Sequence, residues 1–308
     1  MIEEKKEFLD KFIKDSFNYN DFALVVNKLN DFLNKFLYNI AMQIPNIDFK
    51  KRLIGEYALQ TNHSNINLAN VIIEYHYNKE DYEYSLNRSN KGQIKALISD
   101  TVNYDKQIIP TIKELTQALF HELSVCLNAE NVVIRKNAIG VSFLDYQFCI
   151  NFVGINDSIK NNTLDFVLKG KKYNFEDFDL LNEKLIEKNN ETNGKFFDVI
   201  KLFKVVEFEL STYNMVKILA SKNLYFYENL LFNIPNKLLN NKYAYDNLVA
   251  CYNYLANTKP DKLVDPTNNP LIKDYYELFT KYYITTHDLK RVLKQTKLFI
   301  ENIENILK

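Results

Sequence analysis

Two asparagine side chains separated by one residue give this sequence its most distinctive chemical feature. Asn65 and Asn67 precede a β-branched and aromatic segment, residues 71–77, whose composition is typical of a strand. Side chains two positions apart on a strand point to the same face, so paired carboxylates at this spacing can hold divalent metal ions. An amide oxygen also binds Mg²⁺, but it is neutral and attracts the ion much less. The pair therefore has the spacing of metal ligands without their charge.

A third asparagine lies in a separate predicted strand. Asn151 is surrounded by apolar residues within the strand candidate 147–155, and two further candidates, 131–135 and 138–144, come just before it. Because most residues around Asn151 are apolar and do not alternate strictly with polar ones, we expect this strand to be buried.

Helical patterns surround these strand candidates. Apolar residues recur every three or four positions in residues 3–44, which predicts two amphipathic helices that end before Pro45, and again in the helix candidate 110–128. A hairpin is predicted at 164–175, and helices follow to the end of the chain, with breaks near residues 192–194, 234–236 and 259–270. The polar segment 78–107 is predicted to hold a mobile loop or an inserted helix. The fold class is thus α+β: a small mixed sheet with flanking helices and a helical C-terminal lobe, divided into residues 1–175 and 176–308.

Composition narrows the functional classes. Lysine plus arginine and aspartate plus glutamate each number 39, so the formal net charge is +0 and no global charge signals binding to nucleic acid or a membrane. No apolar run approaches the roughly 20 residues needed to span a bilayer. Three widely spaced cysteines form neither a disulfide framework nor a zinc pattern. We therefore expect a cytoplasmic protein without membrane association.

The segment around the asparagine pair resembles the active-site turn of the DNA polymerase β-like nucleotidyltransferase superfamily. Gly55 and Glu56 stand at the family's Gly-Ser pair, Gln60 and Thr61 at a second Gly-Thr-like pair, and residues 64–68 where Ser-Asp-Ile-Asp-Leu would be. The resemblance extends to the branch that contains cyclic GMP-AMP synthase, oligoadenylate synthases, bacterial cyclic-oligonucleotide synthases and, more distantly, poly(A) polymerases.

Later segments match the same family. The strand with Asn151 resembles the one that carries the third catalytic acid, and the helix at 193–204 resembles a helix whose lysine reaches the nucleotide phosphates. Lys201 or Lys204 would take that role. Residues 223–230 and 263–269 resemble the family's Tyr-Glu and Asp-Pro segments. The resemblance thus implies nucleotide contacts by a set of residues spread over both lobes: Gly55, Glu56, Thr61, Ser64, Lys201 and Lys204.

The departures from the family pattern argue against catalysis. Asn65, Asn67 and Asn151 stand at all three acid positions, and Glu56 places a negative charge where a serine hydroxyl meets polyphosphate. We therefore expect no metal site, no cofactor and no nucleotidyl transfer. The predicted role is that of a pseudoenzyme that binds a protein partner or an active subunit, with RNA and nucleotide as other possible ligands.

Two alternatives remain open at this stage. In the first, the chain is an active nucleotidyltransferase that makes cyclic or linear oligonucleotides or extends RNA, with Mg²⁺ held by Glu56, Glu74 or Asp145. In the second, the resemblance is accidental and the chain is an unrelated α+β adaptor.

Overall fold

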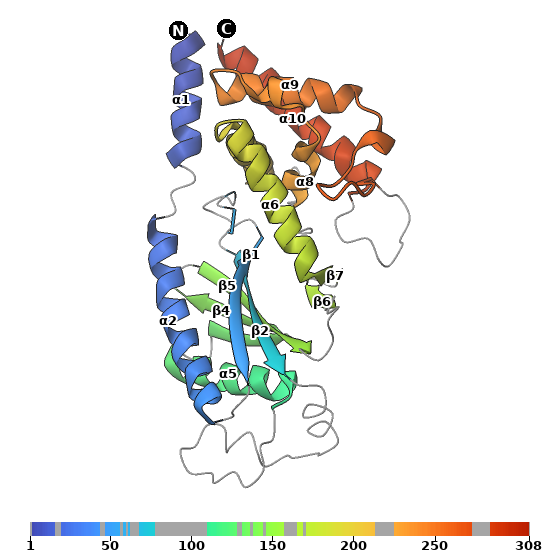
Figure 1. Ribbon diagram of the computed structural model, residues 1–308. Coiled ribbons are helices and arrows are strands. Elements are labelled where there is room, and N and C mark those ends of the chain that lie inside the picture. Colours follow the sequence, from blue (N-terminus) through green and yellow to red (C-terminus); the bar gives the residue numbers. More distant parts are fainter. Residues whose placement is uncertain are drawn as a thin grey trace. The chain divides into compact units, whose positions relative to one another are not determined.

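The computed structural model describes most of the chain in two compact units (Figure 1). One unit comprises Tyr19–Tyr57 and Asn67–Leu164, and the other comprises Met1–Asn18, Ala58–Ile66 and Asp165–Lys308. Neither unit is continuous in sequence, and the division of domains after residue 175 stays a prediction. The residues described are 2–15, 20–43, 47–55, 58–59, 61, 68–77, 110–127, 131–135, 138–143, 146–156, 165–168, 171–212, 225–272 and 284–307.

The first unit contains the mixed sheet that the sequence predicts. Its strands lie in the order β1-β2-β5-β4-β3, and only β2 and β5 run parallel, while the other neighbours are antiparallel. The bounds of its elements are α2 (Asn20–Gln43), β1 (Asp48–Ile54), β2 (Leu68–Tyr77), α5 (Ile112–Leu127), β3 (Val132–Arg135), β4 (Ala138–Phe143) and β5 (Tyr146–Asn156).

Both helices of this unit pack on the same face of the sheet. Buried residues of α2, such as Leu29, Leu33 and Leu37, share one core with Leu119 of α5 and with alternate residues of the strands. On β2 these are Val71, Ile73 and Tyr75, and on β5 they are Phe148, Ile150 and Phe152. Because strand side chains alternate between faces, the intervening residues of β2 and β5 lie on the opposite face, which neither helix covers.

Strand β1 is the element that sequence patterning does not predict. Its residues include Lys50, Lys51 and Arg52, which have weak intrinsic preference for strands. Antiparallel pairing with β2 along the whole length of β1 forms the strand nevertheless. An edge position suits the basic side chains, because they protect a sheet edge from unwanted pairing.

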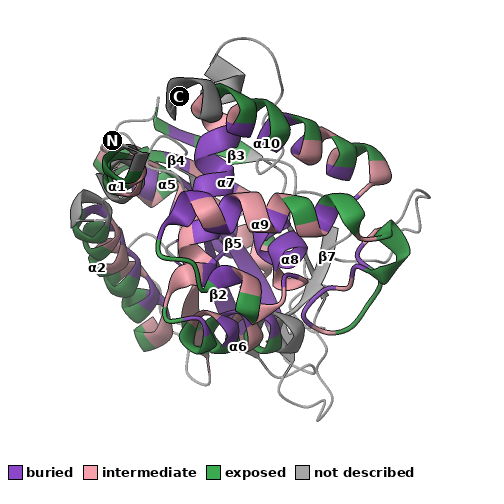
Figure 2. Cartoon of the chain, turned by 90° about the horizontal axis from the view of Figure 1, so that it is seen from above, coloured by how far each residue is buried: buried purple, intermediate pink, exposed green. Residues whose placement is uncertain are grey.

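The second unit is built around the helix α7 (Lys195–Thr212). This helix packs against α1 (Ile2–Asp15), α6 (Phe175–Glu191), α8 (Phe226–Phe232), α9 (Ala244–Asn257) and α10 (Thr286–Leu307). Most of the described side chains of α7 are buried, whereas α10 has one exposed side (Figure 2). The unit also contains a hairpin of β6 (Asp165–Leu168) and β7 (Lys171–Asn174) and the 3₁₀ helices η2 (Asn236–Leu239) and η3 (Pro260–Lys262). The α+β prediction is therefore confirmed, including the hairpin and the helical C-terminal part.

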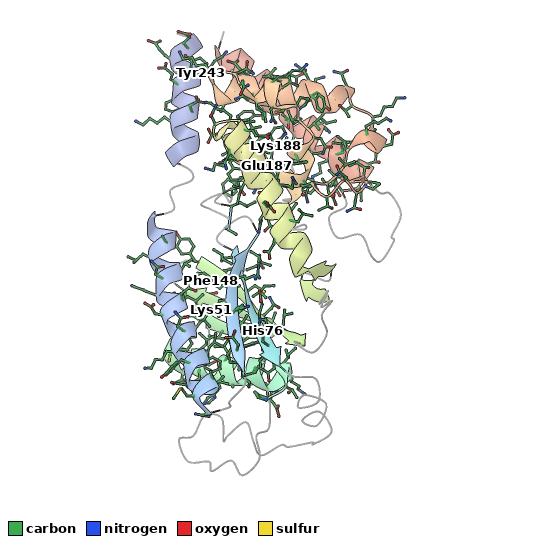
Figure 3. All side chains as sticks on the ribbon, in the orientation of Figure 1. Lys51, His76, Phe148, Glu187, Lys188 and Tyr243 are labelled. Atoms are coloured by element: carbon green, nitrogen blue, oxygen red, sulfur yellow. The ribbon has the colours of Figure 1, made fainter. Side chains whose placement is uncertain are left out.

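A buried lysine fixes the loop that follows α8. Lys188 of α6, labelled in Figure 3, donates to the carbonyl oxygen of Ile234 at 2.7 Å and to Asn236 Oδ1 at 3.0 Å. Its ammonium group also lies over the rings of Phe196 and Phe232. Burial lowers the pKa of Lys188, and the carboxylate of Glu191 partly opposes this shift. These contacts place the break that the sequence predicts near residues 234–236.

Helix boundaries follow local sequence signals. Thr285 and Asp288 cap α10 reciprocally, as Thr285 Oγ1 donates to Asp288 Oδ2 at 2.7 Å and accepts from the Asp288 amide at 3.1 Å. Thr111 and Glu114 make the same exchange at the start of α5. After α6 ends at Glu191, Asn193 with a φ of 50° and Gly194 with a φ of 84° form the turn, and the Gly194 amide donates to the Asn189 carbonyl at 2.8 Å. Among the residues described, no helix is both long and apolar enough to cross a bilayer.

The turn between α6 and α7 yields a stability prediction. Gly194→Ala should lower the free energy of unfolding by about 1–2 kcal/mol, because an L side chain is strained at positive φ. No neighbouring atom lies within 4 Å of an added Cβ, so the loss comes from the backbone alone. Urea titration followed by circular dichroism measures it.

The adjacent residue supplies the matched control. Asn193 also has a positive φ, of 50°, so Asn193→Gly removes strain and should leave stability unchanged or slightly higher. Equal stability of Gly194→Ala and the unaltered chain would contradict the role assigned to this turn.

Candidate functional site

Asn151 lies in the middle of β5 on the sheet face that α2 and α5 leave uncovered. It pairs with Ile72 of the parallel strand β2 and with Ala138 of β4. The residue is 8% exposed, and its side-chain amide nitrogen lies 3.5 Å from the Cys149 sulfur. The prediction of a buried strand is confirmed, and the neighbouring β2 residues on this face are Asn70, Ile72 and Glu74.

The buried carboxylate on this face is already paired with basic groups. Glu74 is 3% exposed, and the Nε of Arg52 on β1 contacts its Oε1. The ring nitrogen Nε2 of His76, labelled in Figure 3, lies 3.3 Å from Glu74 Oε2. Because the guanidinium neutralises the carboxylate, Glu74 offers little net negative charge to a metal ion. Recruiting it as a ligand would require this ion pair to break.

The other two acid positions and several further residues that the sequence singled out are not described by the structure. Asn65, Asn67 and Ser64, together with Glu56 and Asp145, lie outside the described residues, as does the polar segment 78–107. Gly55 is described: it is buried, and its φ of 84° lets the chain turn at the end of β1. Within the described part of the chain, no three His, Cys, Asp or Glu side chains gather closely enough to hold a metal ion.

Thr61 and Lys204 meet in a buried network in the helical unit. Lys204 Nζ of α7 donates to Glu228 Oε1 of α8 at 2.7 Å and lies 3.3 Å from Thr61 Oγ1. The hydroxyl of Thr61 donates to the same carboxylate oxygen. The side chains of Lys204 and Glu228 are both 0% exposed. The sequence suggested Thr61 and Lys204 separately, and the structure joins them through a carboxylate whose role sequence reasoning missed.

The position of Glu228 depends on an unusual backbone conformation. Tyr225, immediately before α8, has φ 58° and ψ 32°, which lies in the left-handed region and is uncommon for a bulky residue. Its ring is fully buried, and its carbonyl accepts the Asn229 amide at 3.0 Å. Backbone strain of this kind persists only where the surroundings hold it. The signal in the sequence was the Tyr-Glu segment, which the family resemblance marked.

Lys201 differs from Lys204 in its surroundings. It lies one turn earlier on α7 and is only partly buried. Burial lowers the pKa of Lys201, the Asp198 carboxylate raises it, and the Lys204 ammonium lowers it further. Of the two lysines, Lys201 therefore keeps some contact with solvent, whereas Lys204 has none.

The Asp-Pro segment forms a closed turn of its own. Asp265 Oδ1 accepts hydrogen bonds from the Thr267 amide at 2.8 Å, the Thr267 hydroxyl at 2.7 Å and the Asn269 amide at 2.9 Å. Asn233, just after α8, fixes this turn by exchanging two hydrogen bonds with the backbone of Val264 at 2.8 and 2.9 Å. The segment thus has a structural role in the described part of the chain.

Comparisons with known proteins identify the fold. The family model described as the cGAS/DncV-like nucleotidyltransferase C-terminal helical domain matches residues 183–304, within the helical unit. No curated protein matches the chain by sequence.

Solved structures of several bacterial proteins share the fold over most of both chains. The Rhodothermus marinus CdnE c-UMP-AMP synthase, solved with Apcpp and Upnpp, is 16% identical with a TM-score of 0.56, and the match covers 87% of this chain and 91% of that one. The STING-associated CdnE c-di-GMP synthase from Capnocytophaga granulosa is 14% identical with a TM-score of 0.57, at 97% and 93% coverage. The E. coli MS115-1 CdnC in its complex with HORMA-deltaN is 14% identical with a TM-score of 0.51, at 90% and 83% coverage.

These findings confirm the resemblance that the sequence suggested. The chain has the fold of the polymerase β-like nucleotidyltransferase superfamily, with a C-terminal helical domain of the cGAS/DncV-like kind. At these identities the likeness of the solved structures concerns the fold, and the assignment of the site residues stays a prediction.

The buried network predicts a large effect on stability. Lys204→Met should lower the free energy of unfolding by about 3–5 kcal/mol, because it leaves the Glu228 carboxylate buried without its cation. The double variant Lys204→Met with Glu228→Leu should lose less than the sum of the two single changes, because neither side chain then carries charge. Denaturant titration of the four proteins measures the coupling.

An exposed ion pair provides the matched control. Lys184 and Glu187 of α6 lie 2.9 Å apart on the surface, so Lys184→Met should leave stability unchanged. Additive effects of the two changes at Lys204 and Glu228 would show that the ion pair does not hold the helices together.

Proposed function

We propose that this chain is a catalytically inactive nucleotidyltransferase-fold protein that acts as a binding or regulatory subunit. The observation that supports this most strongly is the position of Asn151. The neutral amide of Asn151 takes the place of the third acid on a buried strand. Its pairing partner on β2 is Ile72, and the carboxylate of Glu74, two residues further along β2, is paired with Arg52.

The electrostatics of metal binding explain why this matters. Two-metal phosphoryl transfer needs carboxylates to hold two divalent ions beside a polyphosphate, where the ions align the reactants and neutralise developing charge. Three asparagines supply oxygen ligands but no negative charge, so they do not offset the cost of stripping water from Mg²⁺. An active site rebuilt around Glu74 would first have to displace Arg52.

The burial of the two α7 lysines indicates which of them is the better candidate for binding a nucleotide. The burial of Lys204 and Thr61 favours a structural role for both, while Lys201 is the better candidate for contact with a phosphate. We assign the phosphate contact to Lys201, and the assignments of the turn residues Gly55, Glu56 and Ser64 rest on the sequence resemblance.

A protein partner is the first expectation for a regulatory subunit. A solved structure with this fold, CdnC of E. coli MS115-1, is itself a complex with HORMA-deltaN. That complex supports the view that this fold can present a surface to another protein. RNA and nucleotide are the other ligands that the proposal includes.

The absence of catalysis can be tested directly. Incubation of the chain with radiolabelled nucleoside triphosphates and Mg²⁺ or Mn²⁺ should give no linear or cyclic oligonucleotide above the protein-free background. The triple variant Asn65→Asp, Asn67→Asp, Asn151→Asp restores the missing charges and should form more product than the unaltered chain.

A charge-matched control carries three Asn→Asp changes at exposed helical positions, Asn34, Asn39 and Asn253. It should be as inactive as the unaltered chain. Robust metal-dependent product from the unaltered chain would refute the proposal and favour an active enzyme with a non-standard metal site.

The binding role has a separate test. Fluorescently labelled ATP should bind in the presence of EDTA, since the proposed contacts use no metal ion. Lys201→Met should weaken this binding about tenfold, because a charge-assisted hydrogen bond to phosphate is lost. Lys184→Met, at an exposed site, should leave the affinity unchanged. If both lysine variants bind labelled ATP as tightly as the unaltered chain, Lys201 does not contact the nucleotide.

A further inference from the structure

Two side chains on α10 have buried polar atoms without hydrogen-bond partners. Arg291 Nε and Nη2, and Gln295 Nε2 and Oε1, are shielded from solvent and unpaired in the described part of the molecule. Arg291 as a whole is partly buried, and Gln295 is 4% exposed. Residues four apart on a helix are neighbours on its surface, so the two side chains lie on one side of α10.

The described side chains of α10 do not supply a carboxylate to Arg291. Asp288, one turn toward the N-terminus, accepts hydrogen bonds from Thr285 at the helix cap. Glu301, further toward the C-terminus, lies 3.7 Å from Lys297. Buried donors without acceptors are costly and rare in folded proteins, and an unobserved ion is one of their recognised explanations.

The two unpaired nitrogens of Arg291 have a fixed arrangement within the guanidinium group. Nε and Nη2 form one edge of the guanidinium plane, and the N–H bonds on that edge run parallel, which suits two oxygens of one oxyanion. Gln295 adds a third donor, Nε2, and one acceptor, Oε1. A group that satisfies all four atoms must present at least three acceptor sites and one proton.

The geometry points to a site for inorganic phosphate formed by Arg291 and Gln295. Near neutral pH this tetrahedral anion keeps a P–OH group, which donates to Gln295 Oε1 while its other oxygens accept from the three N–H groups. Sulfate has the same shape but carries no proton, so it leaves Oε1 unpaired. The site is independent of the proposed function, because α10 holds none of the residues assigned there. Because the four atoms are covered, the surrounding side chains must open when the anion enters.

Anion selectivity tests the site in the full-length chain. Phosphate at 10 mM should raise the Tm by about 3 °C or more, since a ligand that binds only the folded state stabilises it. Sulfate at equal ionic strength should raise it by less than half as much. Calorimetric titration at pH 7.5 then compares phosphate with AMP, a phosphate monoester that has mostly lost its second proton, with a pKa of about 6. Tighter binding of phosphate than of AMP supports the site, because only phosphate keeps the P–OH group that Gln295 Oε1 accepts from, and equal or tighter binding of AMP would overturn that role.

Three variants test whether Arg291 and Gln295 supply the atoms that bind phosphate and distinguish it from sulfate. Arg291→Lys keeps the positive charge but loses the two parallel N–H bonds of the guanidinium group, so phosphate affinity should fall at least about tenfold. Gln295→Met keeps the volume and removes both polar atoms, so phosphate and sulfate should then bind equally. Lys294→Met, on the exposed side of the same helix, should bind phosphate as the unaltered chain does.

The outcomes are decisive even if Arg291→Lys does not fold, because Gln295→Met and the anion comparison remain. Equal stabilisation of the unaltered chain by phosphate and sulfate, or no stabilisation by phosphate, would overturn the proposal. An equal loss of phosphate affinity in Lys294→Met would also overturn it, because it would show attraction by general positive charge.

Discussion

The buried ion pair between Lys204 and Glu228 is the interaction on which the helical unit depends. Two opposite charges with no solvent exposure are tolerable only when each satisfies the other, because desolvating an unpaired charge costs several kcal/mol. The pair joins α7, the central helix of the unit, to α8, and Thr61 adds a residue from a distant part of the sequence. The strained backbone at Tyr225 is held in place beside this network.

The two faces of the sheet differ in what they contribute: one packs against α2 and α5, and the other carries Asn151. Alternate residues of β2 and β5 build one core with α2 and α5, while the residues between them, Asn151 among them, lie on the other face. A change of Asp to Asn at position 151 would therefore leave the core packing intact. This physical separation would allow a nucleotidyltransferase fold to persist if its acids were replaced, as the proposed function requires.

Much of the fold is predictable from sequence because its helices have strong apolar periodicity. The spacing of Leu29, Leu33 and Leu37 in α2 is an example, and the hairpin and the break at Gly194 follow from equally local signals. Strand β1 is different. Its basic residues have little strand preference, and only pairing with β2, some 20 residues later, makes it a strand.

The site is less predictable than the fold because it depends on contacts between residues that are distant in the sequence, as β1 does. Alternation predicts that Asn151 is on a buried strand, but the pairing of Arg52 with Glu74 requires the antiparallel register of β1 and β2. Likewise, a lysine that the family resemblance assigns to phosphate binding proves to be buried against Glu228, because α8 brings a carboxylate to it. Long-range pairing of this kind leaves no local sequence signal. Arg291 and Gln295 show the opposite case, in which polar residues on the buried side of a helix are visible in sequence but their lack of partners is not.

The central claim is that this chain keeps the nucleotidyltransferase fold without the ability to hold its two metal ions. Electron paramagnetic resonance of Mn²⁺ tests it most directly, in the presence of the chain and a non-hydrolysable nucleoside triphosphate. The account predicts at most the one Mn²⁺ ion that the nucleotide itself carries, with no magnetic coupling between metal ions. Two protein-bound Mn²⁺ ions per chain, close enough to couple magnetically, would contradict it.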